Sequence, residues 1–172
     1  MREADVAYCA GIVDGEGTIV VNRPKQKTKD GPRWYYRAHV KVTMLDPEAV
    51  DRLHEVFGGG VKHTSNGYYH WYLFAQRAAD ALAEMLPHLR VKRAQAEAVI
   101  AYQNDWTANA GKKTRTGPTD PDGERAYTRL RELKRVHTMS RYAVQPQRLS
   151  AGTDALSIGS DSPALSDGKA ET

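Results

Sequence analysis

The stretch from Arg33 to Thr43 alternates strictly between two kinds of side chain. One side carries Trp34, Tyr36, Ala38, Val40 and Val42, whereas the other carries Arg33, Tyr35, Arg37, His39, Lys41 and Thr43. A repeat of about two residues is typical of a β-strand with one buried and one open face. Such strands belong to antiparallel sheets that helices cover on one side only. The chain is therefore predicted to have a basic and aromatic sheet surface that stays free to meet a partner.

The remaining segments predict further strands, which come in pairs between helices. Strands are predicted at 18–22, 61–64 and 68–74, and helices at 5–14, 46–57, 75–85, 92–102 and 124–136. Asp46-Pro47 is a strong helix start, because it combines an N-cap with a proline in the first turn. Residues 24–32 are interpreted as a polar, Lys-rich turn, and the inward face of 68–74 stays undecided because both faces carry aromatic side chains. Paired strands between helices indicate an α+β fold, with helices packed on one face of an antiparallel sheet.

The 172 residues carry a net charge of +4 that is unevenly distributed along the chain. Residues 18–45 hold seven basic residues against one acidic residue, and residues 112–148 hold ten against four. The segment 150–172 has a net negative charge and is rich in Ser, Gly and Ala, so we expect a disordered tail there. Residues 1–149 are expected to form one domain, with a core at 5–103 and a basic helical extension at 108–149. This basic body suits a polyanionic partner, although a solvated surface would carry the same charge.

Composition also excludes several classes of protein. No run of about 18 apolar residues is present, and the first residues lack the apolar stretch of a signal peptide. We therefore expect a soluble, intracellular protein with no membrane partner. Cys9 is the only cysteine, which excludes an internal disulfide and a zinc site built from several cysteines.

The helix predicted at the N-terminus ends in two carboxylates, Asp14 and Glu16, that are interleaved with glycines. Carboxylates at a helix C-terminus are disfavoured by the helix dipole, by about 0.3–1 kcal/mol. A divalent cation would reverse this penalty, with Glu16 as a hard oxygen ligand and the glycines letting backbone carbonyls face the ion. An acidic, solvent-facing turn fits the same residues and is the commoner occurrence, so the local pattern leaves both interpretations open.

The segment Cys9-Ala10-Gly11-Ile12-Val13-Asp14-Gly15-Glu16-Gly17 resembles the nine-residue signature of the LAGLIDADG homing endonucleases. Ala10, Gly11, Asp14 and Gly17 match by identity, and Glu16 replaces the usual second aspartate with another carboxylate. Cys9 and Gly15 depart from the signature, but neither departure removes a chemical group that the family's reaction needs. The order of predicted elements also resembles the family's αββαββα core, with its saddle-shaped antiparallel sheet, over about residues 5–103.

This resemblance implies a site-specific double-stranded DNA endonuclease that hydrolyses phosphodiester bonds with Mg²⁺, in a site that Mn²⁺ or Ca²⁺ could also occupy. Glu16 would hold the metal, with the carbonyl of Gly15 as a further ligand. Lys92 would be the catalytic cation near the scissile phosphate, with Arg90 as the alternative. Relatives often carry a glutamine at the end of the second strand, and residues 42–46 of this chain contain none.

A single signature per chain implies a homodimer, because both strands of the DNA must be cut. The signature helices would pack against each other, with the small residues Ala7, Ala10 and Gly11 at the interface. The open sheet face would straddle the DNA major groove. The residues expected to contact DNA are Arg23, Lys25, Lys27, Lys29, Arg33, Tyr35, Arg37, His39, Lys41, Lys62, His63, His70 and Tyr72.

A second class of protein shares this fold without the chemistry: a DNA- or RNA-binding protein such as an intron-splicing factor or a transcription regulator. The carboxylate of Glu16 favours the enzyme, since a relative that does not cut DNA is free to lose it. An unrelated basic RNA-binding α+β domain would require the signature to be a coincidence.

Overall fold

The computed structural model describes residues 2–29, 31–109 and 121–143, and within these the side chains of all but 26, 28, 32, 33 and 137–143. The helices are α1 (Arg2–Glu16), α2 (Pro47–Phe57), α3 (Ala75–Met85), α4 (Arg93–Ala108) and α5 (Pro121–Ala143). The strands are β1 (Thr18–Asn22), β2 (Lys25–Thr28), β3 (Gly31–Trp34), β4 (Arg37–Met44), β5 (Gly60–His63) and β6 (Tyr69–Phe74). The tail predicted at 150–172 lies outside the described residues, as does most of the linker before α5.

Four strands form an antiparallel sheet in the order β1-β4-β6-β5, so the predicted α+β class is confirmed. The alternation predicted along β4 is also confirmed, because Ala38, Val40 and Val42 are fully buried. Val40 pairs in register with Ile19 of β1, and Val42 pairs with Trp71 of β6. The pairing therefore gathers the apolar side chains of neighbouring strands on one face of the sheet.

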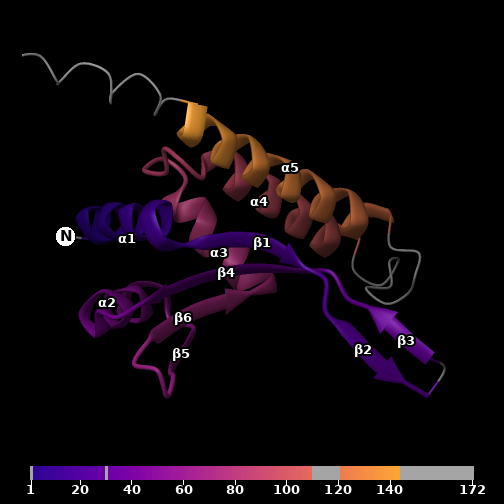
Figure 1. Cartoon of the computed structure of the whole chain (residues 1–172), viewed down its shortest axis with the longest axis horizontal. Coiled ribbons are helices and arrows are strands. Elements are labelled where there is room, and N and C mark those ends of the chain that lie inside the picture. The colour runs from indigo at the N-terminus through magenta and orange to yellow at the C-terminus, as the bar shows by residue number, and fades with distance from the viewer. Residues whose placement is uncertain (1, 30, 110–120, 144–172) are drawn as a thin grey trace, which may run out of the picture.

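Helices cover that apolar face, and α1, α4 and α5 lie above the sheet in Figure 1. The sequence left undecided which face of β6 points inward, and the structure shows that it is the face that carries Trp71. The indole N–H of Trp71 donates to the carbonyl of Gly58 at 2.7 Å. Phe57, the last residue of α2, packs against the same indole, with ring centroids 6.4 Å apart. The predicted start of α2 is confirmed, because the Asp46 carboxylate accepts the backbone N–H of Glu48 at 2.9 Å. No helix of the described part of the chain covers the other face of the sheet (Figure 1), which is called the open face below.

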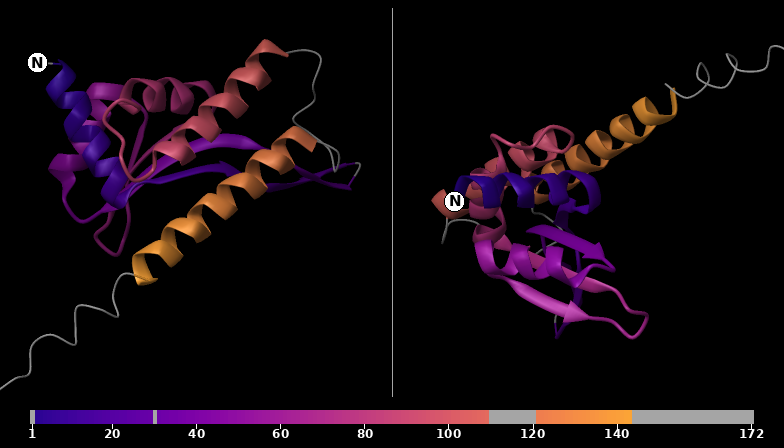
Figure 2. Two further views of the ribbon diagram at one scale, coloured as in Figure 1. Left: turned by 90° about the horizontal axis from the view of Figure 1, so that it is seen from above. Right: turned by 90° about the vertical axis from the view of Figure 1, so that its left-hand side faces the viewer.

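The prediction of a turn at 24–32 is wrong, because β2 and β3 pair there as a two-stranded ribbon. Lys25 pairs with Trp34, and Thr28 pairs with Gly31 at the tip, where Gly31 has a φ of 106°. The predicted strand at 33–43 is accordingly divided, with Trp34 ending β3 and Arg37 starting β4. Residues 25–32 are mostly polar and show no apolar alternation, so they gave no strand signal; Trp34, at the base of the ribbon, is the residue that packs against the core. Figures 1 and 2 show the ribbon leaving the sheet at the end opposite α1.

The C-terminal extension folds back as α5, which begins at Pro121 and packs along α4 and β1. Leu130 of α5 is buried in the core that the sheet and the other helices share. No helix within the described part of the chain is long and apolar enough to cross a membrane.

Candidate functional site

The last residue of α1 is Glu16, whose side chain is exposed and pairs with no cation among the described residues. Gly17 closes the helix by donating its N–H to the carbonyl of Val13 at 2.9 Å. A Cβ atom on Gly17 would lie 2.5 Å from that oxygen, so this turn requires glycine. Thr18 then starts β1 and pairs with Lys41 on the open face. The carboxylate of Glu16 therefore lies at the edge of the open sheet face.

Asp14 is not part of a solvent-facing acidic turn, because its carboxylate binds the loop before α4. Its two oxygens accept the backbone N–H groups of Arg90 at 2.6 Å, Val91 at 3.1 Å and Lys92 at 2.9 Å. Three N–H donors offset the unfavourable position of a carboxylate at a helix C-terminus. No local pattern predicts this contact, since its partners are backbone groups 76 to 78 residues away.

Lys92 makes the reverse contact with the end of α1. Its ammonium donates to the carbonyls of Val13 at 2.9 Å, Asp14 at 2.6 Å and Gly15 at 3.2 Å. The last carbonyls of a helix lack intrahelical partners and form the negative end of the dipole, so a cation there is doubly favourable. The structure thus brings Lys92 next to Gly15 and Glu16, whereas the side chain of Arg90 is exposed.

The residues at this helix end fit a magnesium ion in part. Glu16 supplies one free hard oxygen ligand, and Mg²⁺ commonly binds one or two carboxylates and takes its other ligands from phosphates and water. The carbonyl of Gly15 already faces the Lys92 ammonium, so a metal would share this oxygen with a cation. Within the described part of the chain, no group of three or more His, Cys, Asp or Glu side chains converges to hold a metal.

The residues predicted at the dimer interface occupy different positions on α1. Ala10 is fully buried in the core of its own chain, Ala7 is half-buried, and Gly11 is exposed with open space around its Cα. Gly15 is exposed in the same way, and the side chain of Tyr8 is 54% exposed. Tyr8 and the two glycines therefore form one exposed stripe along α1, with Ala7 at its border.

The open face of the sheet is concave where β4, β5 and β6 meet. A hollow of about 300 Å³ is lined by His39, Lys41, Lys62, His70, Tyr72 and Phe74. Lys41 pairs in register with Tyr72, and Lys62 pairs with His70, so cationic and aromatic side chains alternate across the strands. Five of the residues predicted to contact DNA thus line one surface.

His39 is fixed in one orientation and one protonation state. The amide nitrogen of Asn22 lies 2.8 Å from its Nδ1, which must accept because this nitrogen can only donate. The proton of the neutral ring is therefore on Nε2. The ring stacks on Phe74 with centroids 4.5 Å apart. Burial, together with the neighbouring charges of Arg37 and Lys41, lowers the pKa of His39 to about 4.

His70 and Arg37 are also held by their neighbours. The Nδ1 atom of His70 lies 2.8 Å from the hydroxyl of Thr43. Desolvation, with smaller effects of Lys41 and a second lysine in the hollow, lowers the pKa of His70. The guanidinium of Arg37 lies 3.8 Å from the centroid of the Phe74 ring, a cation–π contact that orients an otherwise exposed side chain.

The other residues predicted to contact DNA are divided between the ribbon, β5 and the base of the ribbon. Lys25, Lys27 and Lys29 are exposed along the ribbon, and Tyr35 is half-buried between β3 and β4. The exposed His63 stacks on Tyr69 with ring centroids 4.5 Å apart. Arg33 lies in β3, but its side chain is not among those that the structure describes. Arg23 is turned toward α5, where it pairs with Glu124.

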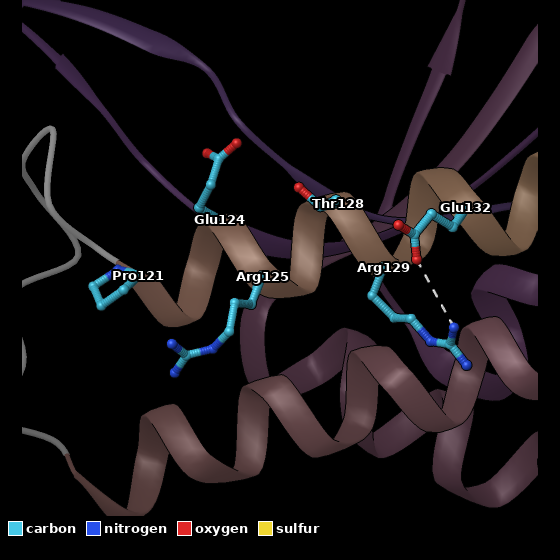
Figure 3. A pocket seen from close by; sticks show the side chains of 6 residues that line it. All are labelled: Pro121, Glu124, Arg125, Thr128, Arg129 and Glu132. Carbon is cyan, nitrogen blue, oxygen red and sulfur yellow. Dashed lines mark ion pairs between the residues drawn. The ribbon is translucent and has the colours of Figure 1, made fainter.

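A second hollow, of about 410 Å³, follows the outer side of α5 (Figure 3) and was not predicted from the sequence. Figure 3 shows Arg125 and Arg129 pointing away from Glu124, which is directed toward the strands. The two arginines pair with acids of their own helix, Asp122 and Glu132. These pairs within one helix leave little uncompensated charge in this hollow.

The element order α1-β1-β4-α2-β5-β6-α3, with helices on one face of the antiparallel sheet, is the fold of the LAGLIDADG homing endonucleases. The homing endonuclease I-CvuI, in complex with the I-CreI target, superimposes with a TM-score of 0.59 at 19% identity, over 77% of this chain and 83% of that chain. The archaeal intron-encoded homing endonuclease I-Vdi141I, complexed with DNA, gives 0.55 at 16% identity, over 81% and 85%.

The LAGLIDADG homing endonuclease I-GzeII, in complex with its DNA target, gives a TM-score of 0.50 at 14% identity. It matches 92% of this chain, which spans only 54% of the I-GzeII chain. No protein-family model and no curated protein sequence matches the chain. At these identities the similarity establishes the fold, and the roles of individual residues depend on the geometry given above.

Replacing Lys92 by methionine should lower the free energy of unfolding by about 1–3 kcal/mol, because a charged donor to three helix carbonyls is lost. Urea unfolding followed by circular dichroism measures this change. Arg90→Ala is the matched control and should stay within about 0.5 kcal/mol of the wild type, since only its backbone N–H contacts Asp14. Equal stability of Lys92→Met and wild type would contradict the capping role.

His39 should stay neutral, with its proton on Nε2, down to about pH 5. Its pKa of about 4 lies below the ordinary 6.5, so between these values the unfolded chain binds a proton that the folded chain does not. The stability that His39 contributes is therefore present above pH 6.5 and is lost as the pH falls toward 4. NMR detection of the ring nitrogens measures both properties. Titration of His39 near 6.5, or a proton on Nδ1, would contradict this assignment.

Proposed function

We propose that the protein is a site-specific double-stranded DNA endonuclease that acts as a homodimer and uses Mg²⁺. The observation that carries this proposal is the free carboxylate of Glu16, one residue beyond the carbonyl that the fixed ammonium of Lys92 contacts, at the edge of a concave, basic sheet face. A binding protein has no need of an unpaired carboxylate near the phosphates of its ligand, because the charge repels them.

The open sheet face supports recognition of duplex DNA. Side chains that alternate along a strand reach base edges in the major groove, where arginine is the commonest specific contact to guanine. Arg37, oriented by Phe74, and His39, with its Nε2–H as a donor, present fixed hydrogen-bond donors for purine acceptor atoms. Lys41 and Lys62 contribute positive charge to the same hollow. The exposed lysines of the ribbon suit phosphate contacts, which position a protein on DNA without reading its sequence.

Two copies of the chain are needed to cut both strands, since each chain contributes one Glu16. The lengths of the similar structures support this requirement. One copy of this chain spans 83% of the I-CvuI chain but only 54% of the I-GzeII chain, so the I-GzeII chain has room for two copies of the fold. The exposed glycines of α1 would let a second α1 approach closely. This places two helix ends, each with a carboxylate, side by side at the centre of the assembly.

Within each centre the residues of this chain have distinct tasks. Glu16 would hold the metal, which when bound polarises the phosphate and activates water. Lys92 acts as a fixed positive charge that stabilises the negative charge developing on the phosphate, because its position is set by three carbonyls before DNA binds. Its donors are directed at these carbonyls, so its part is electrostatic. The closed turn at Gly17 sets the direction in which the carboxylate leaves α1.

A non-cleaving DNA- or RNA-binding protein is the second candidate, and one observation favours it. The carbonyl of Gly15, the expected second metal ligand, already accepts a hydrogen bond from Lys92 at 3.2 Å. A centre that never holds metal would be stable in this arrangement, with Glu16 left in solvent.

A mixed dimer of one wild-type and one Glu16→Gln subunit should nick one strand of a cognate duplex, whereas the wild-type dimer should cut both. Glutamine keeps the size of the side chain but removes the charge that holds Mg²⁺. The measurement is strand-resolved cleavage of a site selected from a randomised duplex library, with and without Mg²⁺. Glu3→Gln, an exposed substitution in the first turn of α1, is the control and should cut normally.

Tight DNA binding by the wild type without metal-dependent cutting would instead establish the non-cleaving alternative. Sedimentation of the DNA complex as a single subunit per site would contradict the homodimer.

Arg37→Ala and Lys27→Ala should weaken DNA binding in different ways. Loss of the oriented guanidinium should remove about 1–3 kcal/mol of discrimination at one base pair. Loss of Lys27 should weaken binding to all sequences equally and reduce the slope of log K against log salt by about one. Binding to a panel of single-base variants at several salt concentrations measures both effects. A uniform loss for Arg37→Ala would show that this residue contacts only phosphate.

A further inference from the structure

The base of the β2–β3 ribbon is tied to the first turn of α5 by Arg23. One guanidinium nitrogen of Arg23 lies 2.9 Å and 3.0 Å from the two carboxylate oxygens of Glu124. The same guanidinium lies over two aromatic rings, 4.5 Å from the centroid of Trp34 and 5.4 Å from that of Tyr127. The side chain of Arg23 is only 30% exposed, so this ion pair is partly removed from water. Arg23, which lies between β1 and β2, therefore contacts both β3 and α5 at one point.

Tyr36 forms the second half of this junction. Its hydroxyl donates to the carboxylate of Glu124, and its backbone carbonyl accepts the hydroxyl of Tyr102 of α4 at 3.1 Å. The ring lies against the backbone of α5 so closely that a Cβ atom on Gly123 would be 2.3 Å from its Cγ. Glu124 thus accepts hydrogen bonds from both Arg23 and Tyr36, which lie in two different connections between strands.

The two residues occupy the two places where the chain passes between sheet and ribbon. Arg23 lies between the end of β1 and the start of β2, and Tyr36 lies between the end of β3 and the start of β4. The backbone N–H of Tyr35 donates to the carbonyl of Pro24 at 3.0 Å, and this hydrogen bond joins the two crossings to each other. An isolated two-stranded ribbon is at best marginally stable, so its direction depends on what holds its base. In the described residues, Glu124 is the acid that holds both crossings.

We propose that α5 is a positioning element for DNA recognition, in which Glu124, through Arg23 and Tyr36, sets the direction in which the β2–β3 ribbon leaves the sheet. This inference rests on the proposed function, since it concerns the DNA contacts of the ribbon. The ribbon lies at the end of the sheet opposite α1, so in a dimer joined at α1 it meets the outer base pairs of each half-site (Figure 1). Arg23 is then a positioning residue, and Lys25, Lys27 and Lys29 make the contacts.

A purely stabilising role for the same ion pair makes a different prediction. If Glu124 only held α5 on the domain, its loss would lower the melting temperature and leave the ribbon and the base preferences unchanged. Ribbon direction and position-resolved specificity therefore distinguish the two roles.

The first test needs no DNA. Spin labels at Lys29→Cys in the ribbon and Glu55→Cys in α2 report the ribbon direction as a distance distribution in pulsed electron spin resonance. Cys9 is buried and its pKa is raised to about 11, chiefly by desolvation, so it should stay unlabelled. Glu124→Ala and the milder Tyr36→Phe should broaden or shift the distribution. Glu132→Gln, which alters an ion pair farther along α5, should leave it as in the wild type.

The second test measures DNA discrimination base pair by base pair. Where a mismatch at an outer base pair costs the wild type about tenfold in affinity, Glu124→Ala should reduce this to less than about threefold and leave the central positions unchanged. Tyr36→Phe should have a smaller effect of the same kind, and Glu132→Gln none. Equal loss at all positions, or no loss at outer positions, would overturn the proposal.

The two tests separate this proposal from the proposed function. An unchanged distance distribution in Glu124→Ala and Tyr36→Phe overturns the positioning role, whatever the DNA result. A changed distribution in a protein that binds no duplex DNA supports the mechanical link and removes the proposed function.

Discussion

The reciprocal contact between the end of α1 and residues 90–92 is the interaction on which the candidate site depends. Asp14 accepts three backbone N–H groups from the loop, and Lys92 returns a charged donor to the carbonyls of α1. Each charge occupies a position that would be unfavourable or solvated if it were alone, and together they satisfy the last turn of the helix. Because Asp14 and Lys92 are engaged in this way, Glu16 is left as the free carboxylate. The same contact fixes the start of α4 against the end of α1, so the site forms where two helices are joined.

The sequence predicted those parts of the fold in which burial leaves a periodic pattern. The alternation along β4 follows from one face lying in the core, and the N-cap at Asp46 is a local signal that needs no tertiary contact. The ribbon left no such pattern, since it packs against the core through Trp34 at its base, and its polar residues indicate a turn. The face of β6 could not be chosen either, because the choice depends on a hydrogen bond between Trp71 and the carbonyl of Gly58.

The candidate site shows the same division between local and long-range information. Glu16 follows from the local signature and Lys92 from the family resemblance, but the capping contact that fixes Lys92 joins residues about 78 positions apart. Arg23 was grouped with the lysines because of its charge, whereas its partner Glu124 is 101 residues away. A residue type indicates what chemistry is available, and only the tertiary structure shows whether that chemistry is directed outward to a ligand or inward to another side chain.

The open face combines charged and neutral donors in a small area. Lys41 and Lys62 contribute the positive charge that attracts any polyanion, whereas His39 is held neutral by burial and by the charges of Arg37 and Lys41. A neutral ring donates one hydrogen bond in one direction and adds little to unselective attraction. General attraction and directional recognition are thus assigned to different residues that share one hollow.

The strict alternation along β4 also bears on how such a protein could acquire a new target. Ala38, Val40 and Val42 hold the core together, while Arg37, His39 and Lys41 point the other way and take no part in that packing. Substitutions in the second set leave the first intact, so binding preference can change while the scaffold stays the same. Phe74 limits these substitutions, because its ring contacts both Arg37 and His39. Replacing one of these two residues therefore changes the surroundings of the other.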